Sequence, residues 1–278
     1  MALTLILNTV LIPLALGLIL AALFRFGKLQ GGLLALASMA AVLAIYMVLE
    51  GIPPLPPVSS KHKIWYIIMG LGVVNVLFGF KHKTPHPILT ALLLLASFVW
   101  IAYRKISSDI MQPELFLGLI PIAIATVVAN APKRQQQDAF LWPVTLLTAA
   151  VAGSLVSVLG SYIGLGQVLG AIAALLGGFL AVVYLAEHIL KRPVSEGLVL
   201  SSMTWMVTSA MAVILLSIAV FAAKLSALAF ALVCLVFLTP FVAPRFIKTT
   251  YWWRPFAIGG IALVPAVVAV GTAWVSAN

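Results

Sequence analysis

The chain has 278 residues, of which 64% are hydrophobic and 8% are charged, and it holds six acidic residues against sixteen Lys and Arg. A soluble domain carries about 25% charged and 45–50% apolar residues, so this composition excludes a water-soluble fold and makes the lipid bilayer the solvent. The net charge of +10 comes from basic residues set in pairs between apolar runs, rather than from the continuous basic face that nucleic-acid binding needs.

Ten apolar segments follow one another along the chain, each close to the ~20 residues that a helix needs to cross a bilayer. The first segment is expected to be a span rather than a cleaved signal peptide, because its basic residues follow its apolar run. The sequence therefore predicts an all-α, polytopic membrane protein with about ten transmembrane helices. The segments are 2–24, 31–50, 64–80, 88–103, 115–130, 141–163, 166–190, 198–222, 225–243 and 256–276.

The basic residues predict how these helices are oriented. Eleven of the sixteen Lys and Arg fall in the first, third, fifth, seventh and ninth connections (the odd connections), and five fall in the even ones. Short loops with an excess of basic residues stay in the cytoplasm. We therefore expect cytoplasmic odd connections, both termini outside, and residence in the bacterial cytoplasmic (inner) membrane.

The most polar stretch, residues 133–138, divides the chain into two halves. We expect a first five-helix half at 1–130, a cytoplasmic linker at 131–140 and a second five-helix half at 141–278, within one membrane domain. Because five is odd, the halves would enter the membrane in opposite orientations. This is the 5+5 inverted repeat found in many transporters.

A polar side chain, Asn75, lies in the middle of the third predicted helix. At membrane depth such a group is costly unless it is paired. Two functions fit it: it could hydrogen-bond a solute on a transport path, or it could hold a neighbouring helix with a bond worth about 0.6 kcal/mol. The sequence leaves both open.

Small residues line one face of each of the sixth and seventh predicted helices, at the α-helical rotation of about 100° per residue. Lipid tails are as apolar as leucine, so membrane helices associate through the close backbone approach that small residues permit. We therefore expect a tight helical hairpin that turns at the Gly-Leu-Gly sequence at 164–166, with Leu175 facing away from the partner helix. The residues expected to make this packing are Gly153, Gly160, Gly166, Gly170, Ala174 and Gly177.

Towards its end, the seventh predicted helix carries Tyr184, Glu187 and His188. Because imidazole titrates near neutrality, a carboxylate and an imidazole at this place could form a proton relay. The alternative is an interfacial pair close to Lys191 and Arg192, within reach of water. Both interpretations stay open.

The eighth predicted helix begins with hydroxyl-bearing residues around a tryptophan. Ser201, Trp205 and Thr208 share one helical face, at spacings of four and three residues. With Asn75, that face could line a solute path in which the indole forms one wall. It could equally join helices through hydroxyl hydrogen bonds.

Sequence motifs of common enzyme and metal sites are missing. The sequence contains no Gly-x-x-x-x-Gly-Lys-Ser/Thr phosphate loop and no His-Glu-x-x-His pair. His62, His82 and His86 lie in predicted loops without a spaced set of carboxylates, so no metal site is expected. No cofactor and no catalytic residue is predicted.

These observations leave two functions of different classes open. One is a small permease for an uncharged or weakly charged solute. The other is a non-catalytic scaffold or accessory subunit of a larger membrane complex, which short loops and few acidic residues favour. A third function, an enzyme that acts on lipids, has less support, because the sequence contains no cluster of acidic and basic catalytic residues. The expected partners are the lipid bilayer and either other membrane subunits or a second copy of the chain, and no nucleic acid is expected.

The predicted orientation can be tested at the C-terminus. Alkaline phosphatase fused after Asn278 should be active, because ten spans return the C-terminus to the outer side. The measurement is phosphatase activity of intact cells. An inactive fusion, together with a fluorescent protein that glows at the same position, would overturn the orientation.

Overall fold

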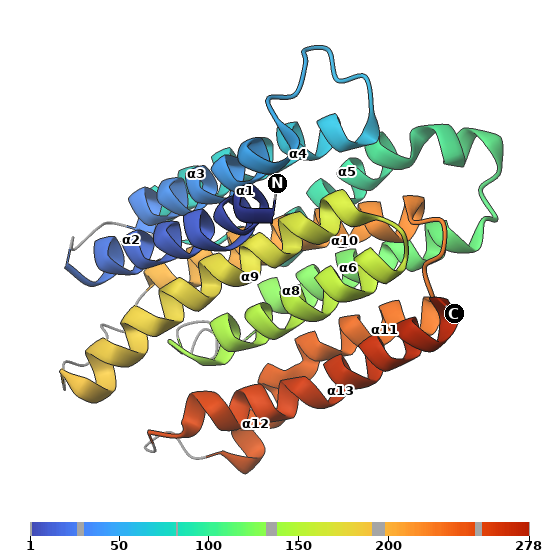
Figure 1. Cartoon of the computed structure of the whole chain (residues 1–278). Coiled ribbons are helices and arrows are strands. Elements are labelled where there is room, and N and C mark those ends of the chain that lie inside the picture. Colours follow the sequence, from blue (N-terminus) through green and yellow to red (C-terminus); the bar gives the residue numbers. More distant parts are fainter. Residues whose placement is uncertain are drawn as a thin grey trace.

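The structure is a computed structural model that describes residues 2–26, 31–81, 83–131, 138–190, 198–247 and 252–277 (Figure 1). Within these ranges the chain is helical and contains no strand. Among the described residues, nine helices are long and apolar enough to cross a membrane, and a tenth apolar helix is shorter. The expected fold class, an all-α polytopic membrane protein, is therefore confirmed.

The described residues of the first half form five helical rods. The first rod is continuous through α1 (Ala2–Ile6), the π-helical turn η1 (Leu7–Leu11) and α2 (Ile12–Phe26). The shorter apolar helix is the fifth rod, whose 17 residues are at the lower limit of the ~17–25 that cross a bilayer. The second to fifth rods are α3 (Gly31–Glu50), α4 (Ser60–Phe80), α5 (Pro87–Ser108) and α6 (Pro113–Ala129).

The described residues of the second half also form five rods, two of which change helical type along their length. α9 (Ile163–Tyr184) continues as the π-helical turn η2 (Leu185–Ile189). α11 (Ala227–Leu235) continues through the 3₁₀ turn η3 (Val236–Leu238) into α12 (Thr239–Phe246). The uninterrupted rods are α8 (Leu141–Leu159), α10 (Leu198–Phe221) and α13 (Arg254–Ala277).

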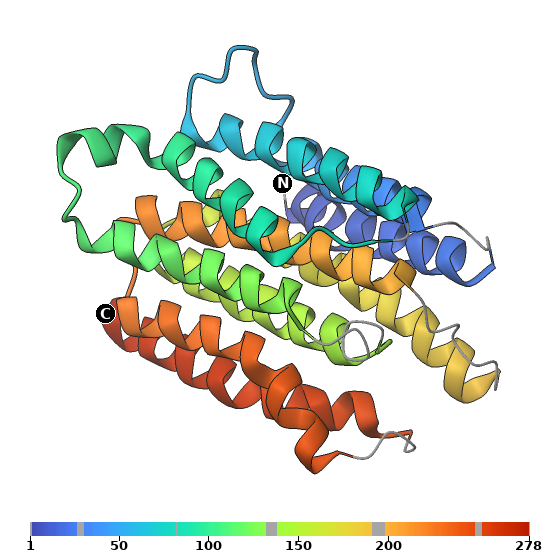
Figure 2. The same ribbon diagram turned by 180° about the vertical axis from the view of Figure 1, so that it is seen from behind.

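Successive rods run in alternating directions, so the helix ends gather at two ends of the bundle (Figure 1 and Figure 2). α2, α4, α6, η2 and α12 all finish at one end, which we call the odd end because the odd connections follow them. α3, α5, α8 and α10 finish at the opposite end, the even end. The bundle thus separates the odd from the even connections, as the predicted orientation requires.

α10 is the centre of the bundle. Every residue from 201 to 220 is buried, and the neighbours of the helix are α3, α4, α5, α6, α8 and α9. In lipid a buried helix needs protein on all sides, and the hydroxyls at the start of α10 would be costly against acyl chains. The remaining helices are arranged around this one.

At two glycines, α2 and α9 approach so closely that no side chain would fit between their backbones. A Cβ added to Gly17 would collide with the carbonyl oxygen of Leu175, and one added to Gly178 would collide with the carbonyl oxygen of Leu14. α3 and α4 meet in the same way, since a Cβ on Gly79 would lie 2.9 Å from the backbone of Gly32. These are the backbone contacts through which membrane helices associate.

α8 and α9 lie side by side and antiparallel, but their turn differs from the expected one. It lies at residues 160–162, because α9 has already begun before the Gly-Leu-Gly sequence at 164–166. Ser161 supplies the sharp bend with a φ of 65°, and the Ser157 hydroxyl donates to the carbonyl of Tyr162 at 2.8 Å. The expected turn at 164–166 is therefore wrong by four residues.

Four of the six small residues predicted to pack this hairpin, Gly153, Gly166, Gly170 and Gly177, face the other helix of the α8–α9 pair. Added Cβ atoms on Gly166 and Gly170 would face Ser154, and one on Gly177 would face Leu147 at 3.7 Å. Gly153 faces Leu169 and Leu215, and Gly160 faces Leu225. Gly170, Ala174 and Gly177 are only half-buried. Leu175 faces away from α8 but is 1% exposed, because α2 covers that side of α9.

The two halves are packed differently. In a 5+5 repeat α10 corresponds to α4. In the most apolar 18-residue stretch of each helix, 94% of the residues of α10 are buried, compared with 39% of those of α4. A two-fold exchange of the halves would give the two helices similar surroundings. The packing therefore gives the inverted repeat no support, and the division of the chain at 131–140 stays a prediction.

One methyl group added at either of two adjacent glycines of α9 should have opposite effects. Gly178→Ala should lower the free energy of unfolding by about 1–3 kcal/mol, because the new Cβ meets the Leu14 backbone, which has no rotamer to adopt. Gly177→Ala should be neutral or stabilising by up to about 1 kcal/mol, since Ala is the better helix former and Leu147 leaves room. The measurement is unfolding in detergent, and equal losses would contradict the α2–α9 contact.

Candidate functional site

Uncharged polar side chains gather around the first half of α10, towards the odd end of the bundle. Those from α10 are joined by one residue of α4 and one of α5, and all are buried. Asn75 lies near the end of α4 and Thr90 near the start of α5, and both of these helix ends belong to the odd end. We call this group the α10 polar cluster, and it consists of Asn75, Thr90, Ser201, Ser202, Thr204, Trp205 and Thr208.

Asn75 joins α4 to α10. Its Nδ2 donates to the carbonyl oxygen of Ser202 at 2.9 Å, whereas its Oδ1 is buried with no hydrogen-bond partner among the described residues. The reverse amide orientation would set two acceptor oxygens against each other, so the assignment of the two atoms follows from the Ser202 carbonyl. Asn75 thus makes the helix-to-helix bond that the sequence allowed, and also leaves one acceptor available.

Trp205 joins α10 to α5. Its indole Nε1 donates to Thr90 Oγ1 at 2.9 Å, and Thr90 Oγ1 donates in turn to the carbonyl oxygen of His86 at 3.1 Å. His86 caps the start of α5, where its Nδ1 accepts from the Ile88 amide. The chain of hydrogen bonds therefore runs from the centre of the bundle to its odd end.

Two hydroxyls of the cluster lack such bonds. Thr204 Oγ1 and Thr208 Oγ1 are buried and have no hydrogen-bond partner among the described residues. They stand one helical turn apart on α10. Because nearly all buried polar groups in native proteins are paired, each such group needs a specific explanation, such as a water or a ligand.

Two small voids lie between α10 and α6, next to these hydroxyls. The first void measures about 10 Å³, close to the minimum for one water molecule, and the second has no room for one. The first is lined by Thr84, Val128, Ala129, Ser201, Thr204 and Trp205. The second is lined by Pro121, Ile124, Thr208, Ala212, Leu215 and Phe237. Asn75 lines neither of them.

A second group, at the odd end, contains the residues predicted as a proton relay. The rings of Tyr184 and His188 meet edge to face with centroids 4.7 Å apart, and His188 stacks on Phe140 at 5.7 Å. Phe256 of α13 contacts Tyr184 from another side. The Nε2 atom of His188 is buried and has no hydrogen-bond partner among the described residues.

Glu187 and His188 lie on the π-helical turn η2, in which Glu187 is half-buried. π-Helical turns are rare and are frequent at functional sites. The alternative interpretation invoked Lys191 and Arg192, which lie outside the described residues.

An ion pair beside this aromatic group was missed by the sequence analysis. Asp138 Oδ2 pairs with Arg254 Nη2, while Asp138 Oδ1 accepts from the amides of Phe140 and Leu141 at 3.0 Å. The carboxylate thus caps α8 and fastens it to the start of α13. An Asp directly before an apolar run is a helix-capping signal, and it could have been recognised.

A second ion pair lies at the even end and was also missed. Lys61 Nζ is 3.0 Å from Glu50 Oε2, and the Tyr46 hydroxyl donates to the Lys61 carbonyl at 2.7 Å. An added Cβ on Gly164 would collide with Glu50, so the missing side chain of Gly164 makes room for the carboxylate. Burial raises the pKa of Tyr162, and the negative charge of Glu50 raises it further, so this phenol is neutral at pH 7.

Among the described residues, no three His, Cys, Asp or Glu side chains come together as metal ligands would. Comparison of the chain with protein-family models, with curated proteins and with solved structures finds no match. Its function is therefore argued from the geometry alone.

The Trp205–Thr90 bond can be tested by a double-mutant cycle. Thr90→Val should lower the free energy of unfolding by about 0.6–1.7 kcal/mol, because the indole N–H loses its acceptor in an apolar core. Thr126→Val is the control, since the Thr126 hydroxyl bonds only the carbonyl four residues earlier in its own helix. When Trp205→Phe is already present, Thr90→Val should lower the free energy of unfolding little more than Thr126→Val does. Fully additive losses from Thr90→Val and Trp205→Phe would contradict the bond.

Proposed function

We propose that this integral membrane protein is a small permease for an uncharged or weakly charged solute, with a path between α6 and α10. The observation that carries the proposal is a pair of buried hydroxyls, those of Thr204 and Thr208. Neither has a hydrogen-bond partner among the described residues, and each lies beside a void. Leaving such a group unsatisfied costs about 1–3 kcal/mol. A solute that hydrogen-bonds these hydroxyls would offset this cost.

The chemistry of the cluster suggests the class of solute. The hydroxyls of Thr204 and Thr208 can exchange hydrogen bonds with a neutral polar molecule, but no member of the α10 polar cluster carries a charge to balance an ion. Trp205 adds a flat apolar wall beside Ser201 and Thr204. These groups suit a small molecule that has both polar and apolar parts.

The voids are too small for any solute, so on this proposal we expect the described arrangement to be the closed state. A solute would enter only when α6 moves away from α10. Two irregularities of the backbone beside the second void support such a movement. Pro121 gives no amide to the preceding turn of α6, and η3 interrupts the rod that carries Phe237 with a 3₁₀ turn. Both features interrupt the regular hydrogen bonds of a helix, and helices bend at such places.

Tyr184, Glu187 and His188 remain the candidates for proton coupling. Their support is the π-helical turn that carries Glu187 and His188, together with the buried Nε2 atom of His188, which has no hydrogen-bond partner among the described residues. If the odd end is cytoplasmic, as the basic residues predict, both the relay and the α10 polar cluster lie towards the cytoplasm.

Removing the two hydroxyls should separate transport from stability. The double variant Thr204→Val and Thr208→Val should unfold at the same or a higher temperature, because it deletes unpaired polar groups. Transport should fall at least about tenfold, because a site built around hydrogen bonds loses them. Ser217→Ala is the control, since the Ser217 hydroxyl bonds the Val213 carbonyl of its own helix.

The measurement has two stages. Neutral polar solutes are first screened for thermal stabilisation of the wild-type protein in detergent, and those that stabilise it are then assayed for counterflow in proteoliposomes. Unchanged transport in the double variant would remove the α6–α10 path. Absence of transport for every solute, with a membrane protein that co-purifies in constant ratio, would favour the accessory-subunit function instead.

A further inference from the structure

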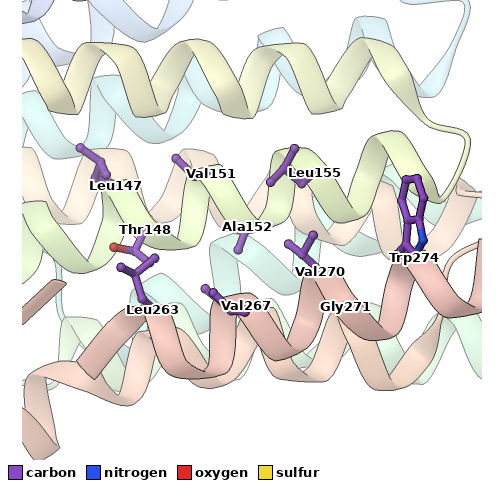
Figure 3. A pocket seen from close by; sticks show the side chains of 11 residues that line it. Leu147, Thr148, Val151, Ala152, Leu155, Leu263, Val267, Val270, Gly271 and Trp274 are labelled. Atoms are coloured by element: carbon purple, nitrogen blue, oxygen red, sulfur yellow. The ribbon is translucent and has the colours of Figure 1, made fainter. Parts of the chain in front are cut away.

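A groove of about 490 Å³ runs between α8 and α13 at the edge of the bundle (Figure 3). Its floor is made of small residues, since Ala152 and Ala266 are buried and Gly271 has no side chain. The α13 side of the groove is 51% exposed at Leu263, 65% at Val267 and 61% at Trp274, so the groove opens at the surface of the bundle. Its walls are formed by Leu147, Val151 and Leu155 of α8 and by Leu263, Val267 and Trp274 of α13.

The groove lies at the depth of one leaflet of the bilayer. From Leu263 to Trp274, α13 rises by about 16 Å at 1.5 Å per residue. Half of the ~30 Å hydrocarbon core is about 15 Å. Trp274 lies in the last turn of α13, at the even end, and tryptophan prefers the interface between acyl chains and headgroups. The groove therefore extends from one interface to about the middle of the bilayer.

Apart from the indole N–H of Trp274, the lining has one polar side-chain group, and that group is already hydrogen-bonded. Thr148 carries the one hydroxyl of the lining residues, and it donates to the Val144 carbonyl of its own helix at 3.0 Å. A ligand of this groove is therefore held by shape and by contact with methyl groups.

The extent of the groove distinguishes a lipid chain from a helix of another protein. A helix that crosses the bilayer follows the whole ~30 Å of the hydrocarbon core. The groove occupies only about 16 Å of that depth, which is what the acyl chains of one leaflet fill. We propose that the groove between α8 and α13 binds one acyl chain of a phospholipid from the leaflet at the even end. This site is independent of the proposed solute path, which lies between α6 and α10.

Two glycines of α13 provide a matched pair of variants. A Cβ on Gly271 or on Gly260 would meet nothing within 4 Å, so either position accepts a side chain without strain. Only Gly271 lines the groove. Gly271→Leu should fill one turn of the groove, whereas Gly260→Leu should leave it open. Val267→Phe and Val268→Phe repeat the comparison at two exposed neighbours, of which only Val267 lines the groove.

The experiment uses the full chain purified in detergent, incubated with dioleoylphosphatidylglycerol and examined by native mass spectrometry. One lipid per chain should stay bound to the wild type and to Gly260→Leu. Gly271→Leu should retain it about tenfold more weakly, equivalent to about 1.4 kcal/mol. Unfolding temperature and monodispersity show whether each variant is folded, and the Val267→Phe comparison decides the matter if Gly271→Leu does not fold.

Three results would overturn the proposal. The wild type could retain no lipid after detergent exchange. The two glycine variants, or the two valine variants, could retain lipid equally. The wild type could instead form a dimer that Gly271→Leu dissociates without loss of lipid, in which case a second copy of the chain occupies this face.

Discussion

The burial of α10 is the constraint on which the rest of the structure depends. Lipid gives apolar helices no hydrophobic reason to associate, so a helix enclosed on every side needs a different cause. α10 has one, because Ser201, Thr204 and Thr208 would be costly against acyl chains. The surrounding helices cover these groups, and the direct bonds of Asn75 and Trp205 fix α4 and α5 against α10. The outer helices, such as α13, then meet the lipid with ordinary apolar side chains.

The sequence predicts the rods well and their neighbours poorly. A run of apolar residues bounded by charged or proline-rich connections determines a helix by itself, so all ten segments could be placed. Neighbours depend on which faces meet in three dimensions. Gly17 and Gly178 lie 161 positions apart, and only the folded chain brings each against the other helix's backbone. The sequence pattern instead predicted close packing at Gly170 and Gly177, where small residues are more numerous, although these two residues are only half-buried.

In the candidate site, too, the polar residues could be predicted from the sequence, whereas their contacts with other helices could not. Asn75, Trp205 and Thr208 stand out in the sequence because they are polar within apolar helices, a local property. The acceptor of Trp205 could not be predicted, since Thr90 is 115 positions away and its role depends on the crossing of α5 and α10. Asp138 is a different case. Its capping of α8 was predictable from position alone, whereas its pairing with Arg254 at the start of α13 was not.

The molecule contains hollows of two opposite kinds, and this contrast is the strongest argument for distinct roles. Between α8 and α13 the hollow is large, apolar and open to lipid, and its one hydroxyl is already paired. Between α6 and α10 the hollows are minute, yet beside them lie two hydroxyls that have no hydrogen-bond partner in the part of the chain that the structure describes. Packing alone explains an apolar groove that lipid can fill. It does not explain why positions 204 and 208 are threonines, since valine would fill the same space without an unpaired hydroxyl. These two hydroxyls are the groups that a transported solute would hydrogen-bond.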